Sequence, residues 1–142
     1  TQFSGLFPQA ARLHMMVKDA VQLARNPEMN RQQVMEQMEC LTATQVLCGA
    51  IYAVLATGEN LDEAMITAVN HSGKSAAVGA VTGAILGAKY GEKTLPAFYM
   101  ECLEPAELLK ELADDLYHGC TMEKGNKLYD LDWDRKYLHG GR

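Results

Sequence analysis

The sequence predicts an all-α fold, and three observations lead to this class. Apolar residues recur at helical spacing through most of the chain, as on one face of a packed helix. Polar residues that favour helix starts precede three of these segments, at Asn30, Thr42 and Asn60. No segment alternates apolar and polar residues over the length of a strand, and no internal repeat is visible. We therefore expect helices joined by short loops.

Composition limits the kind of protein that this chain can be. Its 142 residues are 48% apolar and 22% charged, which suits one domain with a buried core. The net charge of −5, without a basic cluster, argues against a nucleic-acid-binding surface. The uncharged stretch Ser75–Ala88 has 14 residues, fewer than the roughly 20 needed to cross a bilayer, so we expect no membrane partner.

The N-terminus and the cysteines predict a cytoplasmic location. The chain lacks the basic region and apolar run of a secretory signal. Its four cysteines, Cys40, Cys48, Cys102 and Cys120, show neither CxxC pairing nor tight even spacing, so we expect free thiols. Because the first residue is Thr1 rather than Met, we interpret the chain as a fragment.

The first two helices are delimited by prolines and a cap. Pro8 suits a first helical turn, and Pro27 stops the helix that follows it. The apolar residues of that helix keep helical spacing at Ala10, Leu13, Val17, Ala20, Val21 and Ala24. Asn30 with Gln33 resembles a capping box and predicts a short helix that reaches about Met38.

Two further capping boxes predict the next two helices. Thr42 with Gln45 opens a segment, up to Gly58, that has almost no polar face, so this helix should be buried on most sides. Gly58 suits the left-handed position that ends a helix. Asn60 with Glu63 predicts a helix over residues 61–69.

The helix expected over residues 76–88 carries glycines at four-residue spacing. Gly79, Gly83 and Gly87 lie in one row, and a glycine inside a helix costs up to about 1 kcal/mol relative to alanine. Three in register predict a smooth face that packs closely against another helix or a ligand, and we favour a tightly packed helix.

The C-terminal third contains two more expected helices and a tail. Leu95-Pro96 begins a short helix through about Cys102. Pro105 begins another, whose buried face is expected to hold Leu108, Leu109, Leu112 and Leu116. After Gly119 the helical pattern is lost. We therefore expect a helical domain over residues 1–119 and a C-terminal tail over residues 120–142.

The loop that precedes the glycine-rich helix is the candidate binding segment. It offers His71, Ser72, Gly73, Lys74 and Ser75 at the start of a helix, where free N–H groups favour anions. Gly73-Lys74-Ser75 matches the end of a P-loop, so a phosphate- or nucleotide-binding protein is one interpretation. However, the first glycine of that motif falls at Ala68, and the residues before the loop predict a helix instead of a strand.

Metal chemistry is a second interpretation of this region. The loop has no carboxylate for Mg²⁺, and His71 is not spaced for zinc with the other histidines. We interpret His71 as a loop-organising hydrogen bonder. Asp130, Asp132 and Asp134 alternate like the start of a calcium loop but lack its glycine and distant glutamate, so we interpret them as a solvated face.

An ordered set of segments resembles the C-terminal part of the ADP-ribosylglycohydrolase family. The resemblance covers roughly residues 10–118, and the carrying segments are residues 41–53, 58–64, 68–73, 79–91, 95–96 and 112–116. It implies a multi-helix orthogonal bundle and a hydrolase that removes ADP-ribose from proteins. Family members use a two-magnesium centre, and their other acidic ligands come from an N-terminal half that we do not find here.

The metal-ligand motif of that family is degenerate in this chain. In the family, Asp-x-Asp-Ser/Thr follows His-x-Gly, and on this sequence the three ligand positions are Lys74, Ala76 and Ala77. The resemblance therefore implies that the chain belongs to a family of enzymes. However, the Lys74 ammonium and the methyl groups of Ala76 and Ala77 cannot act as magnesium ligands. We expect no cofactor and no catalytic residue in this chain.

Two classes of function remain open at this point. One is a hydrolase that the missing part of the protein completes. The other is an inactive, non-enzymatic binding or assembly module for an ADP-ribose-like small molecule, which the lost carboxylates favour. A helix buried on all sides and a glycine-faced helix both need neighbours, so we also expect a homo-oligomer or a missing N-terminal half as partner.

Overall fold

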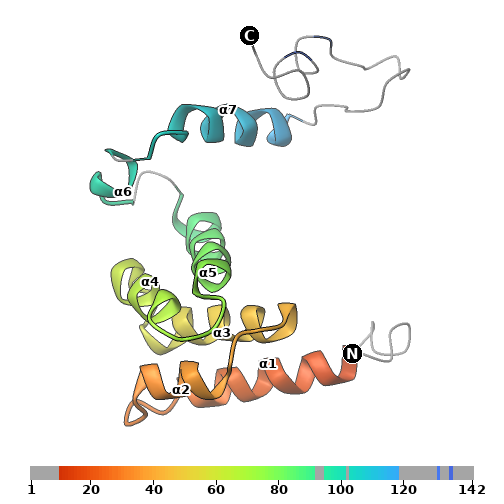
Figure 1. Cartoon of the computed structure of the whole chain (residues 1–142), viewed down its shortest axis with the longest axis vertical. Helices are drawn as coiled ribbons and strands as arrows, with labels where there is room; N and C mark the ends of the chain where they lie inside the picture. Colours follow the sequence, from red (N-terminus) through yellow and green to blue (C-terminus); the bar gives the residue numbers. More distant parts are fainter. Residues whose placement is uncertain (1–9, 92–94, 102, 119–130, 132–134, 136–142) are drawn as a thin grey trace. The chain divides into compact units, whose positions relative to one another are not determined.

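The computed structural model describes residues 10–91, 95–101, 103–118, 131 and 135. Every element in this part of the chain is a helix, which confirms the all-α class (Figure 1). The chain forms two compact units, residues 1–95 and residues 96–142, which are taken separately below. The predicted tail over residues 120–142, with its aspartate run, lies outside the described residues except for Leu131 and Arg135.

The first unit is built around one apolar helix. Helix α3 (Ala43–Ala56) contacts α1 (Ala10–Ala24), α2 (Arg31–Gln37), α4 (Leu61–Val69) and α5 (Ser75–Tyr90), and α5 crosses it steeply (Figure 1). Half of the α3 residues are buried, as the sequence predicts: Val46, Cys48, Gly49, Ala50, Tyr52, Ala53 and Val54. The core therefore lies on most sides of α3, while Leu55 is 42% exposed.

Local caps set the starts of these helices. Asn30 and Asn60 accept the N–H groups of Gln33 and Glu63 at 3.1 and 3.0 Å. At Thr42 the full capping box with Gln45 forms. At Asn60 the return bond is replaced, because the Asn60 N–H donates to the Thr57 carbonyl while Glu63 pairs with Arg31 of α2 at 2.6 Å. The sequence thus predicts the helix start correctly and the partner of Glu63 wrongly.

Gly58 ends α3 in the manner that the sequence predicts. Its φ is +61°, and its N–H donates to the Leu55 carbonyl at 3.3 Å. The N–H of Glu59 reaches back to the Val54 carbonyl at 3.0 Å, which completes a Schellman motif. The turn places the Glu59 carboxylate beside the last residues of α5, where it contacts the Lys89 ammonium and accepts the Tyr90 hydroxyl at 2.7 Å.

This contact predicts an acid-sensitive tie between the ends of α3 and α5. The hydrogen bond from Lys89, followed by that from Tyr90, lowers the pKa of Glu59, and the bond to Glu59 raises the pKa of Lys89. The carboxylate is therefore stabilising above its unfolded-state pKa, and that contribution is lost as pH falls through the lowered value. Lys89→Gln is expected to make the urea midpoint fall less steeply across the acidic range, measured by circular dichroism.

The matched control for this prediction is Lys18→Gln on the exposed face of α1. It removes the same charge and should leave the pH dependence as in the parent chain. An identical acid slope in the Lys89→Gln variant would show that Glu59 gains nothing from this pair.

The glycine row of α5 packs closely only at its first member. A Cβ added at Gly79 would lie 2.9 Å from Val69 of α4, and one at Gly83 would lie 4.0 Å from Met65. A Cβ at Gly87 would meet no atom within 4 Å. The predicted smooth face is therefore a close contact with α4 at the start of α5, and the prediction is wrong for the last turn because the helices diverge.

The second unit contains α6 (Phe98–Glu101) and α7 (Ala106–Tyr117). Both begin near the predicted prolines, but the predicted buried face of α7 is wrong. Leu108, Leu109 and Leu116 are 50%, 47% and 66% exposed, and no residue of α7 is buried. The amphipathic pattern forms the helix, whereas burial also requires a neighbouring element, which the described part of this unit does not provide.

Candidate functional site

The predicted binding loop, residues 70–74, links α4 to α5 and is held by its own polar groups. Asn70 ends α4, and its side-chain amide donates to the Ile66 carbonyl at 2.8 Å. His71 lies with Nε2 3.0 Å from the Ala68 carbonyl oxygen, and its Nδ1 accepts the Gly73 N–H at 3.0 Å. These partners assign the neutral tautomer with its proton on Nε2. His71 thus has the loop-organising role that we expected, with both ring nitrogens occupied.

Helix α2 holds the loop from one side through Glu36. One Glu36 carboxylate oxygen accepts the Ser72 N–H at 3.0 Å, and the other accepts the Ser72 hydroxyl. Glu36 could not be predicted as a partner of Ser72, because no local pattern connects residues 36 positions apart. A carboxylate in the last turn of a short helix would have been the only available indication.

Glu36→Ala is expected to lower the free energy of unfolding by about 1 kcal/mol, because a charge-assisted pair of hydrogen bonds at the surface is lost. Hydrogen exchange at the Ser72 amide should also accelerate. Gln32→Ala, an exposed change on the same helix, is the control and should leave that amide protected. Equal exchange rates in the two variants would contradict a role for Glu36 in holding the loop.

The connector between α2 and α3, residues 38–42, also holds the loop. Gly73 packs against it so closely that an added Cβ would overlap the Glu39 carbonyl oxygen and lie 3.0 Å from the Cys40 Cβ. The Lys74 N–H donates to the Cys40 carbonyl at 3.0 Å. Glycine at position 73 is therefore explained by close backbone packing, and no phosphate is needed to account for it.

This connector has an unusual backbone. Glu39 and Cys40 have φ values of 59° and 49°, in the left-handed region that costs a non-glycine residue roughly 1–2 kcal/mol. Cys40 is fully buried, and burial, together with nearby Cys48 and Glu36, raises the pKa of its thiol. Cys40 and Cys48 are free thiols, as predicted, while Cys102 and Cys120 lie outside the described residues.

Gln45 of α3 ties the other side of the connector. Its Oε1 accepts the N–H groups of Leu41 and Thr42 at 3.2 and 2.9 Å. Its Nε2 donates to Glu39 Oε2 at 2.9 Å. The strained connector is thus fixed by Gln45 on one side and by the loop on the other.

Lys74, Ala76 and Ala77 are the positions that the resemblance assigns to metal ligands, and they lie at the start of α5. Lys74 and Ala76 are exposed, while Ser75 is half-buried. Ala77 is also half-buried and packs against the core cluster around α3. Lys74 stands at the N-cap of α5 without a side-chain capping bond. The structure therefore brings His71 to Ser75 into one turn, with the Lys74 side chain facing solvent.

Two of the chemical interpretations can be compared with this geometry. Helix α4 directly precedes Gly73-Lys74-Ser75, so the strand that a P-loop requires is replaced by a helix. Among the residues with described positions, no three His, Cys, Asp or Glu side chains converge to form a metal site. No helix in the described part is long and apolar enough to cross a membrane.

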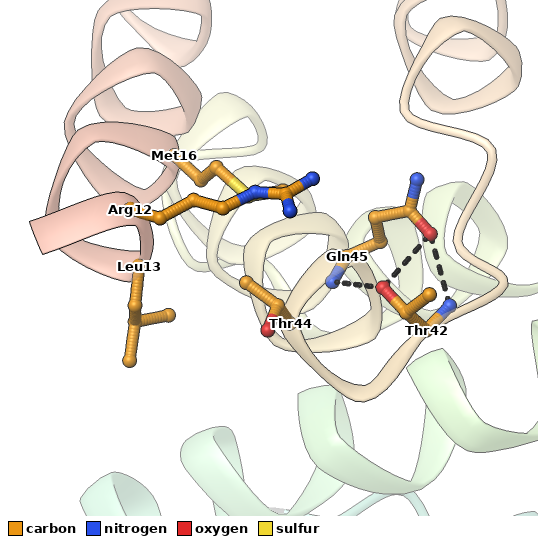
Figure 2. Close-up of a pocket in the computed structure, with 6 residues that line it drawn as sticks. All are labelled: Arg12, Leu13, Met16, Thr42, Thr44 and Gln45. Carbon is orange, nitrogen blue, oxygen red and sulfur yellow. Dashed lines mark hydrogen bonds between the residues drawn. The ribbon is translucent and has the colours of Figure 1, made fainter. Parts of the chain in front are cut away.

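A cavity of about 370 Å³ lies between α1 and the start of α3, and none of its described lining residues belongs to the loop (Figure 2). Its lining residues are Arg12, Leu13, Met16, Thr42, Thr44 and Gln45. Another of about 320 Å³ lies between α2 and α4 and includes Asn70 beside the Arg31–Glu63 ion pair. The sequence analysis singled out neither Arg12 nor Thr44, because both occupy ordinary helix positions.

Comparison with known proteins decides the family. The model of the ADP-ribosylglycohydrolase family matches residues 3–126, most of the chain. The chain belongs to the ADP-ribosylglycohydrolase family. This assignment agrees with the all-helical structure and with the resemblance carried by the segments between residues 41 and 96.

One relative of this ADP-ribosylglycohydrolase family member is an archaeal protein that matches part of the chain. It is an uncharacterized protein of Archaeoglobus fulgidus, 36% identical over 77 residues, which are 54% of this chain and 24% of that protein. The matched part of the chain thus spans about a quarter of the relative's length. No solved structure matches the chain.

Proposed function

We propose that this member of the ADP-ribosylglycohydrolase family is a catalytically inactive binding module for an ADP-ribose-like small molecule. One observation carries the proposal. The loop keeps its shape through Glu36, His71 and the Cys40 carbonyl, while the three family ligand positions hold an ammonium and two methyl groups. A loop held in this way does not need an ion to fold.

Electrostatics favours an anion over a divalent cation at this loop. Methyl groups have no lone pair for Mg²⁺, and the Lys74 ammonium repels a cation at the same position. An ammonium on an exposed turn at the start of a helix instead attracts the phosphate oxygens of a diphosphate. Lys74 would therefore supply the positive charge that the ions supply in other members.

Calorimetric titration of ADP-ribose into the chain tests this proposal. We expect binding that is unchanged by Mg²⁺, together with no release of ADP-ribose from a modified protein. Lys74→Ala should weaken binding at least about tenfold, which corresponds to about 1.4 kcal/mol. Lys18→Ala, an exposed change on α1, is the control and should bind normally. Magnesium-dependent turnover by this chain would overturn the proposal.

A second candidate is a metal-dependent hydrolase completed by residues outside this chain. The length of the Archaeoglobus relative favours it, since the match covers only a quarter of that protein. A longer polypeptide that contains these residues would then release ADP-ribose only with Mg²⁺. Activity that persists after Mg²⁺ is removed by a chelator would exclude this candidate.

Self-association belongs to the same proposal. Met15, Ile66 and Leu116 are among the large apolar side chains left more than half exposed, at 65%, 57% and 66%. Exposed apolar surface of this kind favours contact with another copy or with a further segment. Light scattering at micromolar concentration should give a mass above 15.6 kDa. A monomeric mass would count against a homo-oligomer.

A further inference from the structure

The described residues that line the cavity between α1 and α3 do not include any residue of the loop, and the proposed function does not use this cavity. Its volume of about 370 Å³ falls in the range of small-molecule sites, roughly 300–1,000 Å³. Its wall is formed by Arg12, Leu13 and Met16 of α1 and by residues at the start of α3 (Figure 2). Both helices pack on the same core, so the wall is preformed.

The charge of the cavity is opposite to that of the chain. The sequence holds 18 acidic and 13 basic residues, yet Arg12 is the one charged residue among the described residues that line this cavity. Figure 2 shows its side chain extended past Met16 toward Gln45, above Thr44. A guanidinium presents a planar set of donors that matches phosphate or carboxylate oxygens.

Some polar groups that line the cavity are hydrogen-bonded within the protein, and others are available to a ligand. Thr42 and Gln45 bond to each other, and the Gln45 amide is further engaged by Leu41 and Glu39. Within the described residues, neither the Arg12 guanidinium nor the Thr44 hydroxyl has a protein partner. These two groups are therefore the donors that a ligand would meet.

The apolar side chains that line the cavity indicate which kind of group the rest of the ligand should have. Leu13 and Met16 line it beside Arg12, and Leu13 is 36% exposed. An apolar body can pack there while its anionic end contacts the guanidinium. We propose that this cavity binds a small molecule that carries a phosphate group on an apolar or aromatic body. This proposal is independent of the function proposed for the loop.

Titration followed by two-dimensional NMR tests the cavity with phenyl phosphate, inorganic phosphate and phenol. We expect phenyl phosphate to shift the amides of residues 12–16 and 42–45, with inorganic phosphate weaker and phenol weaker still. Arg12→Gln should raise the Kd at least about tenfold and Thr44→Val severalfold. Arg25→Gln, an exposed arginine at the other end of α1, should bind normally.

Several outcomes would overturn this inference. They are unchanged binding in Arg12→Gln, an equal loss in Arg25→Gln, and phenol that binds as well as its phosphate. Loss of binding in Lys74→Ala would place the phosphate at the loop and also overturn it. Should Arg12→Gln fail to fold by circular dichroism, Arg12→Lys keeps the charge without the planar fork and carries the same test.

Discussion

Gly73→Ala is expected to lower the free energy of unfolding by roughly 3 kcal/mol, because the new methyl group has no space. It would overlap the Glu39 carbonyl oxygen, which belongs to backbone that cannot rotate away. The connector is already in a left-handed conformation at Glu39 and Cys40, so it has little freedom to yield. Urea unfolding followed by circular dichroism measures the loss.

Gly87→Ala is the matched control for this expectation. It is the same substitution in α5, but its Cβ would meet nothing within 4 Å, and alanine favours a helix interior. We expect this variant to gain about 0.5–1 kcal/mol. A Gly73→Ala variant as stable as the parent would show that the loop does not press on the connector.

The second large effect is expected for Met35→Ala, with a loss of about 3 kcal/mol. Met35 is fully buried, and its terminal methyl group lies against Gly49 of α3. Helix α2 has only seven residues, too few to be stable without packing. Because the same helix carries Glu36, the loop should loosen as well, with faster amide exchange at Ser72.

Met15→Ala removes the same side chain from a position that is 65% exposed. We expect its stability to stay within about 0.5 kcal/mol of the parent. Similar losses in the two variants would mean that α2 is not anchored by Met35. Amide exchange at Ser72 that stays slow in Met35→Ala would show that the conformation of the loop does not depend on the packing of α2.

Local sequence rules predict the helices well because caps and breakers act over a few residues. Asn30, Thr42 and Asn60 start helices where expected, and Gly58 ends α3 with a positive φ. The burial of α3 also follows from its lack of a polar face. These features depend on residues within one or two turns of each other, which a single sequence contains in full.

The site could be predicted only in part, because its contacts join distant positions. The loop can be selected from its polar residues and glycine, whereas no pattern in the sequence indicates Glu36 or the connector at Glu39 and Cys40. Two consecutive non-glycine residues in the left-handed region have no local pattern that announces them. The face of α7 fails for a related reason: amphipathicity indicates which side prefers burial, while another element decides whether burial occurs.

The contacts that hold the loop determine which of its residues can be substituted without a change of its conformation. Glu36, His71 and the Cys40 carbonyl accept hydrogen bonds from residues 72–74, while the Lys74 and Ala76 side chains face solvent. The residues that hold the loop in its conformation therefore differ from the residues that it exposes to solvent. Exchanging the exposed side chains is therefore expected to leave the contacts that hold the loop intact, so the surface chemistry of the loop can change without a change of fold.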